Sequence, residues 1–373
     1  MRAANILNLG VKELRSLARD PIMLGLIVYS FTFAVYSAAT AMPETLNRAP
    51  IAIVNEDLSP LSARIAGAFY PPYFVPPVTI NQAEMIARMD AGLDTFALNI
   101  PPNFQRDLLA GREPAIQLNV DATRMGQAFT GSGYIQSIVT GEVREFIARY
   151  RTSAAPPVDL VLRARFNPEL NKAWFGSVME VINQVTMLSI ILTGAALIRE
   201  REHGTIEHLL VMPVTPFEIM TSKVWAMALV VLIACSLSLT FVVQGLLAVP
   251  IEGSVALFLV GAALHLFATT SMGIFLGMVA RSMPQFGLLL ILVLLPLQML
   301  SGGSTPRESM PEVVQFVMLA APTTHFVMLA QAILYRGAGL SVIWPQLAAL
   351  AMIGSVLFGY VLARFRQTIG SMT

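Results

Sequence analysis

The sequence has little charge, few lysines and only one cysteine. Asp, Glu, Lys and Arg make up 13% of its 373 residues, about half of the ~25% typical of soluble domains. The single cysteine, Cys235, excludes a disulfide within the chain. A formal net charge of +1 gives no basic excess, so nucleic acid is not indicated as a partner. With a hydrophobic content of 55% and a mean hydropathy of +0.66, the composition indicates an integral membrane protein.

Motifs for ATP hydrolysis and for common hydrolytic chemistry are absent. The three lysines, Lys12, Lys172 and Lys223, do not complete a GxxxxGK[ST] loop, so the chain does not bind ATP in that way. The sequence contains neither HExxH nor GxSxG. His203 and His208 are five residues apart and fall on different helix faces, which favours solvated loop histidines over a zinc pair. We therefore expect no catalytic residue, metal or cofactor in this chain.

Apolar runs predict six membrane-spanning helices. A hydrocarbon core of about 30 Å requires about 20 helical residues at 1.5 Å per residue. The expected spans are residues 22–42, 178–198, 224–247, 254–280, 286–300 and 343–363. Ala39-Thr40-Ala41 resembles a signal-peptidase site, but the charged segment before the first run is too long and too acidic for a typical signal peptide.

The parts outside the spans are of two kinds. Residues 1–21 form an amphipathic interfacial helix with Lys12, Arg15 and Arg19 on its water-facing side. Residues 43–177 hold 12 of the 24 basic and 13 of the 23 acidic residues, which indicates a soluble domain. Short strands at 51–54, 95–100, 115–120 and 160–166 alternate with helices, so we expect an α/β domain whose strand order the sequence leaves open.

The distribution of Lys and Arg predicts the orientation. Short basic segments remain in the cytoplasm, and six spans place the basic positions at 12–19, 199–223, 281 and 364–366 on one side. A seventh span over 313–334 would move the tail, 364–373, to the other side. We therefore expect cytoplasmic termini, an extracytoplasmic α/β domain, and residues 301–342 as helices at the outer interface, interrupted at Pro322.

Polar groups inside the apolar runs are candidates for a translocation path. Glu180, Asn183 and Gln184 recur at helical spacing at the start of the second span, and they should face protein or a wet cavity. Path lining and interhelical hydrogen bonding explain this stripe equally well. His265 in the fourth span is a functional candidate, although a neutral histidine bonded to a neighbouring helix is the favoured interpretation.

A glycine-rich segment follows the short fifth run, which contains Pro296. Gly302, Gly303 and Pro306 form either a simple turn or a bend that acts as an outer gate. The two interpretations are equally supported, because glycine and proline serve both.

A charged interruption, residues 199–223, separates the second and third spans. Its sequence is REREHGTIEHLLVMPVTPFEIMTSK. Thr205 can cap a short helix with Ile206, Leu209 and Leu210 on one face, and Pro213 ends that helix. A short amphipathic helix on the cytoplasmic side is suited to docking a partner.

This arrangement resembles the ABC-2-type transport permeases, in the multidrug and linearmycin-type exporter branch with a large extracytoplasmic insert. The basic N-terminal helix, the insert opening with IAIVNEDLSPLS, the 199–223 segment and the SGGSTP after the fifth run carry the resemblance. It implies a coupling helix that seats on a separate ATPase subunit, where ATP and Mg would bind. It also implies a second permease chain, identical or related, and leaves room for a periplasmic adaptor. By position, the coupling residues are Glu200, Glu202, Gly204, Thr205, Glu207, Leu209, Leu210 and Pro213.

The expected function is therefore that of the permease subunit of an ATP-driven exporter in a bacterial inner membrane. Its substrate would be drug-like or lipid-like and would leave the cytoplasm or the inner leaflet. The alternative is a membrane-anchored receptor or assembly protein with a ligand-binding extracytoplasmic domain. An ion-driven transporter is disfavoured, because only His265 lies deep in a span and no inverted repeat is evident.

Overall fold

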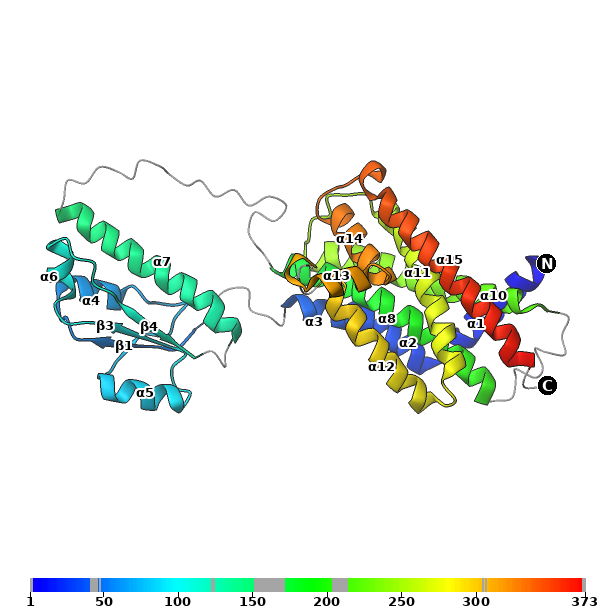
Figure 1. Cartoon of the computed structure of the whole chain (residues 1–373), viewed down its shortest axis with the longest axis horizontal. Helices are drawn as coiled ribbons and strands as arrows, with labels where there is room; N and C mark the ends of the chain where they lie inside the picture. The colour runs from blue at the N-terminus through cyan, green and yellow to red at the C-terminus, as the bar shows by residue number, and fades with distance from the viewer. Residues whose placement is uncertain are drawn as a thin grey trace. The chain divides into compact units, whose positions relative to one another are not determined.

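A computed structural model describes residues 3–40, 46, 48–121, 125–150, 172–202, 214–303, 305 and 307–370 of the chain. It divides into a helical unit, residues 1–42 and 164–373, and an inserted unit, residues 43–163 (Figure 1). The second spanning helix, α8 (Lys172–Glu202), begins several residues before the expected position 178. The inserted unit is therefore shorter than the 43–177 expected from composition.

The inserted unit contains a mixed four-stranded sheet. Its strands lie in the order β2-β1-β3-β4, where β1 pairs in parallel with β2 and β3, and β4 runs antiparallel to β3. The expected strand at 160–166 lies outside the described residues. The strands are β1 (Ile51–Asn55), β2 (Val78–Thr79), β3 (Phe96–Ile100) and β4 (Gln117–Val120).

Helices cover both faces of this sheet (Figure 1). Alternation along β1 sends Ile51 and Ile53 to one apolar core and Ala52 and Val54 to the other. The first core is closed by α4 (Pro60–Gly67), α6 (Phe104–Leu109) and α7 (Met125–Tyr150), and the second by α5 (Gln82–Asp90). Helix α5 begins after a reciprocal capping box, which Asn81 and Glu84 form.

Among the described residues, the helical unit has six helices or joined helices that are long and apolar enough to cross a membrane, and a seventh if the bent pair Glu312–Met318 and Pro322–Leu334 is one span. They match the six runs predicted from the sequence within a few residues at most ends. These candidate spans are Pro21–Thr40, Trp174–Glu202, Pro216–Leu246, Val255–Val279, Met283–Leu300 and Leu340–Phe365. The first joins α2 (Pro21–Tyr29), the π-helix η1 (Ser30–Ala34) and α3 (Val35–Thr40). The others are built from α8, α10 (Pro216–Leu237) with the π-helix η3 (Ser238–Leu246), α11 (Val255–Val279), α12 (Met283–Leu300) and α15 (Leu340–Gly370).

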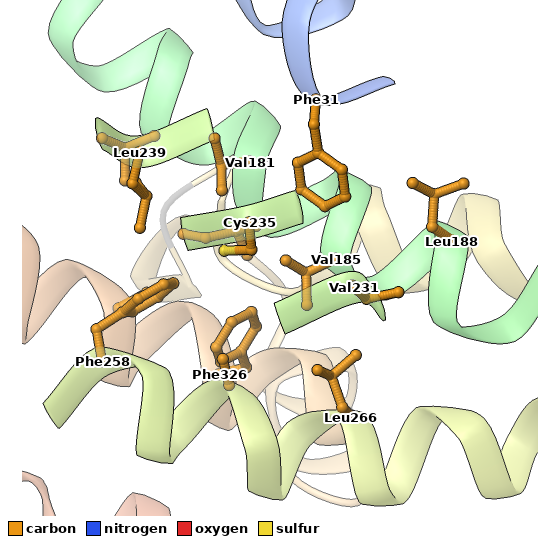
Figure 2. Close-up of a cluster of buried hydrophobic side chains, with 14 of the residues drawn as sticks. Phe31, Val181, Val185, Leu188, Val231, Cys235, Leu239, Phe258, Leu266 and Phe326 are labelled. Carbon is orange, nitrogen blue, oxygen red and sulfur yellow. The ribbon is translucent and has the colours of Figure 1, made fainter. Parts of the chain in front are cut away.

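Helix α8 lies at the centre of the helical unit. Within its most apolar window 83% of the residues are buried, against 17–50% for the other five candidate spans. Figure 2 shows Val181 and Val185 of α8 close to Cys235 of α10, with Phe326 approaching from another helix. The second span is therefore surrounded by protein along most of its length.

Close packing between α8 and α11 depends on small residues. A Cβ atom on Gly273 of α11 would lie 2.6 Å from the carbonyl oxygen of Ile190, so only glycine fits. Ser189 Oγ donates a hydrogen bond of 2.6 Å to Thr269 Oγ1 in the same contact. These contacts hold the two helices in one relative position.

The segment between α12 and α15 differs from the expected outer interfacial helices at 301–342. It contains the 3-10 helix η4 (Arg307–Ser309), α13 (Glu312–Met318) and α14 (Pro322–Leu334). Helices α13 and α14 are bent by 91° relative to each other. Pro322 occupies the first turn of α14, directly after this bend, so the predicted interruption of the apolar run at this position is confirmed. Most residues of α14 are buried, so this helix packs among the spans instead of lying on their surface.

Candidate coupling site and translocation path

The end of α8, residues 199–202, contacts several neighbouring helices through its four charged side chains. Arg199 forms an ion pair with Asp20, whose carboxylate also caps the first turn of α2. Glu200 accepts a hydrogen bond of 2.7 Å from Lys12 Nζ of α1 (Ala3–Ala18). This end of α8 is therefore joined to the first two helices of the chain.

The other two of the four charged side chains at the end of α8 reach helices from the C-terminal half of the chain. Arg201 Nη1 donates a hydrogen bond of 2.6 Å to the carbonyl oxygen of Ala280, where α11 ends. Glu202 Oε1 accepts a hydrogen bond of 3.2 Å from the amide of Met283, where α12 begins. Carbonyls at a helix end favour a cation and amides at a helix start favour an anion, so both contacts match the helix dipoles.

Glu200 also belongs to a partly buried group of four charged residues, which we call the lysine–glutamate cluster. Its members are Lys12, Glu13, Glu200 and Lys223. Lys223 Nζ of α10 lies 2.9 Å from Glu13 Oε1 and 2.7 Å from Glu200 Oε2. Lys223 is 1% exposed and Glu13 6% exposed. Two positive and two negative charges cancel, so no net charge is buried. Removing one member would leave an uncompensated carboxylate or ammonium in a site of low polarity.

The cluster fixes α1 against α10. Trp225 Nε1 donates a hydrogen bond of 3.2 Å to the carbonyl oxygen of Ile6, and its ring occupies the space that a side chain at Gly10 would need. The expected interfacial helix thus has a third side, formed by Gly10, Glu13 and Leu17, which is buried against protein. Sequence periodicity missed this side because it contains an acidic residue. The scarcity of lysine was a signal in the sequence that could have pointed to this cluster, because two of the three lysines of the chain lie in it.

The start of α10 is also fixed. Thr215 and Glu218 form a reciprocal capping box, with distances of 2.9 Å from the Thr215 amide to Glu218 Oε2 and 3.3 Å from the Glu218 amide to Thr215 Oγ1. Pro216 occupies the first turn. The segment 203–213 is thus bounded by two firmly held helix ends.

Of the predicted coupling residues, the structure describes Glu200 and Glu202. Both are engaged in contacts within the chain. The remaining predicted coupling residues lie outside the described residues: Gly204, Thr205, Glu207, Leu209, Leu210 and Pro213. The histidines at 203 and 208 also lie outside them.

The predicted polar stripe lies on one side of α8. Gln184 Nε2 donates a hydrogen bond of 2.5 Å to Glu180 Oε1, and Gln184 is buried, whereas Glu180 and Asn183 are partly exposed. The carboxylate thus accepts from the Gln184 amide one helical turn away, whereas the buried Gln184 Oε1 has no hydrogen-bond partner among the described residues. Path lining by this stripe stays a prediction.

His265 is fully buried between α8, α11 and α14. It shares a hydrogen bond of 2.9 Å with Thr186 Oγ1 of α8. Its ring stacks on Phe326 with centroids 4.2 Å apart and planes 8° apart. In the described part of the chain no hydrogen bond joins His265 to Glu180 or Gln184. This environment fits the favoured interpretation of a histidine bonded to a neighbouring helix.

Two of the three candidate gate residues border a cavity. Gly302, with a φ of +93°, and Gly303 lie at the end of α12 and line a cavity of about 510 Å³. The positive φ explains the glycine at 302, because other residues adopt this conformation at an energetic cost. Pro306 lies outside the described residues. Among the residues that are described, no group of three or more His, Cys, Asp or Glu side chains is placed to hold a metal ion.

Six apolar helices with an inserted α/β unit are typical of a membrane-embedded transport protein. The family model of the ABC-2 family transporter protein matches residues 21–363. The chain therefore belongs to the ABC-2 family of transporter proteins.

Individual relatives cover nearly the whole chain. The chain is 66% identical over 368 residues to the inner membrane transport permease YhhJ of Escherichia coli (strain K12), covering 99% of this chain and 98% of that protein. It is 26% identical over 365 residues to the probable multidrug ABC transporter permease YbhR of the same strain, covering 96% and 97%. A similar match, 26% over 338 residues, is found to the probable multidrug ABC transporter permease YbhS.

Proposed function

We propose that this chain is the membrane-spanning subunit of an ATP-driven exporter in a bacterial inner membrane. In this proposal, a separate ATPase subunit binds ATP and Mg and seats on residues 203–213. Two permease chains pair around a path for a drug-like or lipid-like substrate, with both termini in the cytoplasm. Family membership supports the class, and the names of the relatives support the location and the multidrug substrate class.

The observation that carries this proposal is the set of contacts at the end of α8. Residues 199–202 join α8 to α1, α2, α10, α11 and α12 immediately before the candidate docking segment. A force on residues 203–213 would act on this junction first. Because five other helices are held at the same point, the displacement would reach most of the membrane unit.

Helix α8 provides the route from the junction to the polar stripe. Residues 180 and 200 lie on one continuous helix, about 30 Å apart at 1.5 Å per residue. Helices of this length transmit axial displacement well because each turn is hydrogen-bonded to the next. The proposed assignment gives Glu200 and Glu202 a transmitting role, and gives direct contact with the ATPase to the later residues of the segment.

The test is an export assay in whole cells with paired variants. Leu209→Asp should abolish export because it places a charge on the apolar docking face, whereas Leu209→Ile should retain it. Glu202→Ala should also abolish export, whereas Glu202→Gln should retain a large part, because its amide oxygen can still accept from Met283. Membrane insertion should be normal in all four. Wild-type export by both Leu209→Asp and Glu202→Ala would overturn the coupling assignment.

A further inference from the structure

The cavity beside Gly302 lies at the end of the helical unit opposite to the lysine–glutamate cluster. Phe175 of α8 lines the cavity, and Glu200 of the cluster is 25 residues further along the same helix, about 37 Å away at 1.5 Å per residue. The other walls come from the end of α12, from η4, from α14 and from the first turns of α15. Its volume of about 510 Å³ lies in the range of small-molecule sites, roughly 300–1,000 Å³.

Two arginines give this cavity an excess of positive charge. Arg307 and Arg336 line it together with one acidic residue, Glu308. Glu308 is exposed, and in the described part of the chain neither guanidinium lies within 4 Å of a carboxylate oxygen. Arginine binds carboxylate and phosphate groups through two parallel hydrogen bonds. The unpaired guanidinium groups therefore fit an anionic group.

Polar atoms inside the cavity wall also have unused hydrogen-bonding capacity. The Arg307 side chain donates to the carbonyl oxygen of Gln315 at 3.3 Å and contacts Met328 Sδ at 3.2 Å, but its buried Nε has no partner among the described residues. The buried Oε1 of Gln346 likewise has none there. Unsatisfied buried polar atoms are uncommon in proteins and mark places where a ligand or water completes the bonding.

A large part of the remaining wall is apolar, although Ser301, Gln331 and Gln346 also line it. Phe175, Val327, Ala332, Val342 and Ile343 line it beside the charged groups. A ligand with a charged head and a hydrocarbon part would satisfy both kinds of surface, whereas a small inorganic anion would leave the apolar surface uncovered.

We propose that this cavity binds an anionic amphiphile, with its carboxylate or phosphate head between Arg307 and Arg336 and its hydrocarbon part along α14 and α15. This inference deepens the proposed export function, on which it rests for the direction of passage, by naming the substrate class. Binding itself requires neither an ATPase nor export, so the two ideas can fail separately.

The test measures binding to the purified full chain in nanodiscs of zwitterionic lipid. The probe is a long-chain fatty acid with a fluorophore at its tail, and its methyl ester serves as the uncharged probe. Arg336→Gln should weaken fatty-acid binding about tenfold, the loss expected for one charge-assisted hydrogen bond. Arg336 is exposed, so this change should leave folding intact. Val342→Trp, at the exposed edge of the cavity, should block both probes.

The matched control is Arg281→Gln, which removes an exposed arginine far from the cavity and should leave binding unchanged. Competition by phosphatidylglycerol added to the nanodisc would support the proposal and identify a bilayer lipid as the source. Competition only by a free fatty acid would support it and identify a soluble amphiphile. Equal affinity for acid and ester would overturn it, as would inorganic phosphate binding as tightly as the amphiphile. Binding unaffected by both Arg336→Gln and Val342→Trp would also overturn it.

Discussion

The lysine–glutamate cluster predicts a specific pattern of stability changes. Lys223→Met keeps most of the length of the side chain and removes its charge. Glu13 then loses its partner at 2.9 Å and keeps only Lys12 at 3.8 Å, while Glu200 keeps Lys12 at 2.7 Å. Breaking a buried ion pair costs about 3–5 kcal/mol. We expect the lower end, about 3 kcal/mol, because Lys12 is half exposed and partly neutralises the remaining carboxylates.

A second substitution separates charge imbalance from lost packing. Lys223→Met combined with Glu13→Gln leaves one neutral pair, Lys12 with Glu200, and no excess charge. Replacing a buried ion pair by neutral groups is often close to neutral in free energy. The double variant should therefore be about 2 kcal/mol more stable than Lys223→Met alone, a coupling typical of residues in direct contact.

Cys235 provides the assay. It is the only cysteine of the chain and is fully buried, so a fluorogenic maleimide reacts with it when the helical unit unfolds. In a unit of this size each kcal/mol corresponds to roughly 2–4 °C, so the midpoint for Lys223→Met should fall by about 6–12 °C. Arg15→Met, an exposed change on the same α1 helix, is the control and should stay within about 0.5 kcal/mol of the original chain. A midpoint for Lys223→Met equal to that of the control, or a double variant no more stable than the single one, would refute the reasoning.

Two further predictions concern the α8–α11 contact and the inserted unit. Gly273→Val should lower the midpoint of Cys235 labelling, because its new atoms would overlap the Ile190 carbonyl. Gly287→Val should leave this midpoint unchanged, because a Cβ atom there has nothing within 4 Å. Equal midpoints for the two variants would contradict the close approach of α8 and α11. Burial raises the pKa of Asp107, but its hydrogen bond and ion pair with Arg112 outweigh this effect, so the net pKa is lowered. The stabilisation from a lowered pKa is present above the ordinary aspartate pKa and is lost as the pH falls through the folded-state value. Asp107→Asn should therefore flatten the acid side of the stability profile of the inserted unit, followed by circular dichroism; an unchanged profile would contradict the assignment.

Much of the architecture could be predicted from local sequence. Span number followed from the lengths of the apolar runs, because a bilayer sets a minimum helix length. The start of α5 depends on Asn81 and Glu84, whose capping contacts are three residues apart. Such features depend on near neighbours in the chain, which a sequence shows directly.

Features that depend on distant partners could not be predicted. Glu13 and Lys223 are 210 residues apart, so helical periodicity could not show that the two side chains pair. The break at Pro322 could be predicted from the proline itself, but the burial of α14, which starts there, depends on α11 and α15. His265 was recognised as unusual, yet only the structure shows its bond to Thr186 and its contact with Phe326.

The most direct test of the central claim is purification of the full chain from its native membrane in a gentle detergent, followed by identification of partners and an ATPase assay. The account predicts a stoichiometric ATP-binding subunit with the original chain and with Leu209→Ile, and its loss with Leu209→Asp. The Cys235 labelling midpoint should be the same in all three, which shows that the chain is folded. A folded chain without an ATP-binding subunit would contradict the account and favour a membrane-anchored receptor, with the inserted α/β unit as the place to search for its ligand.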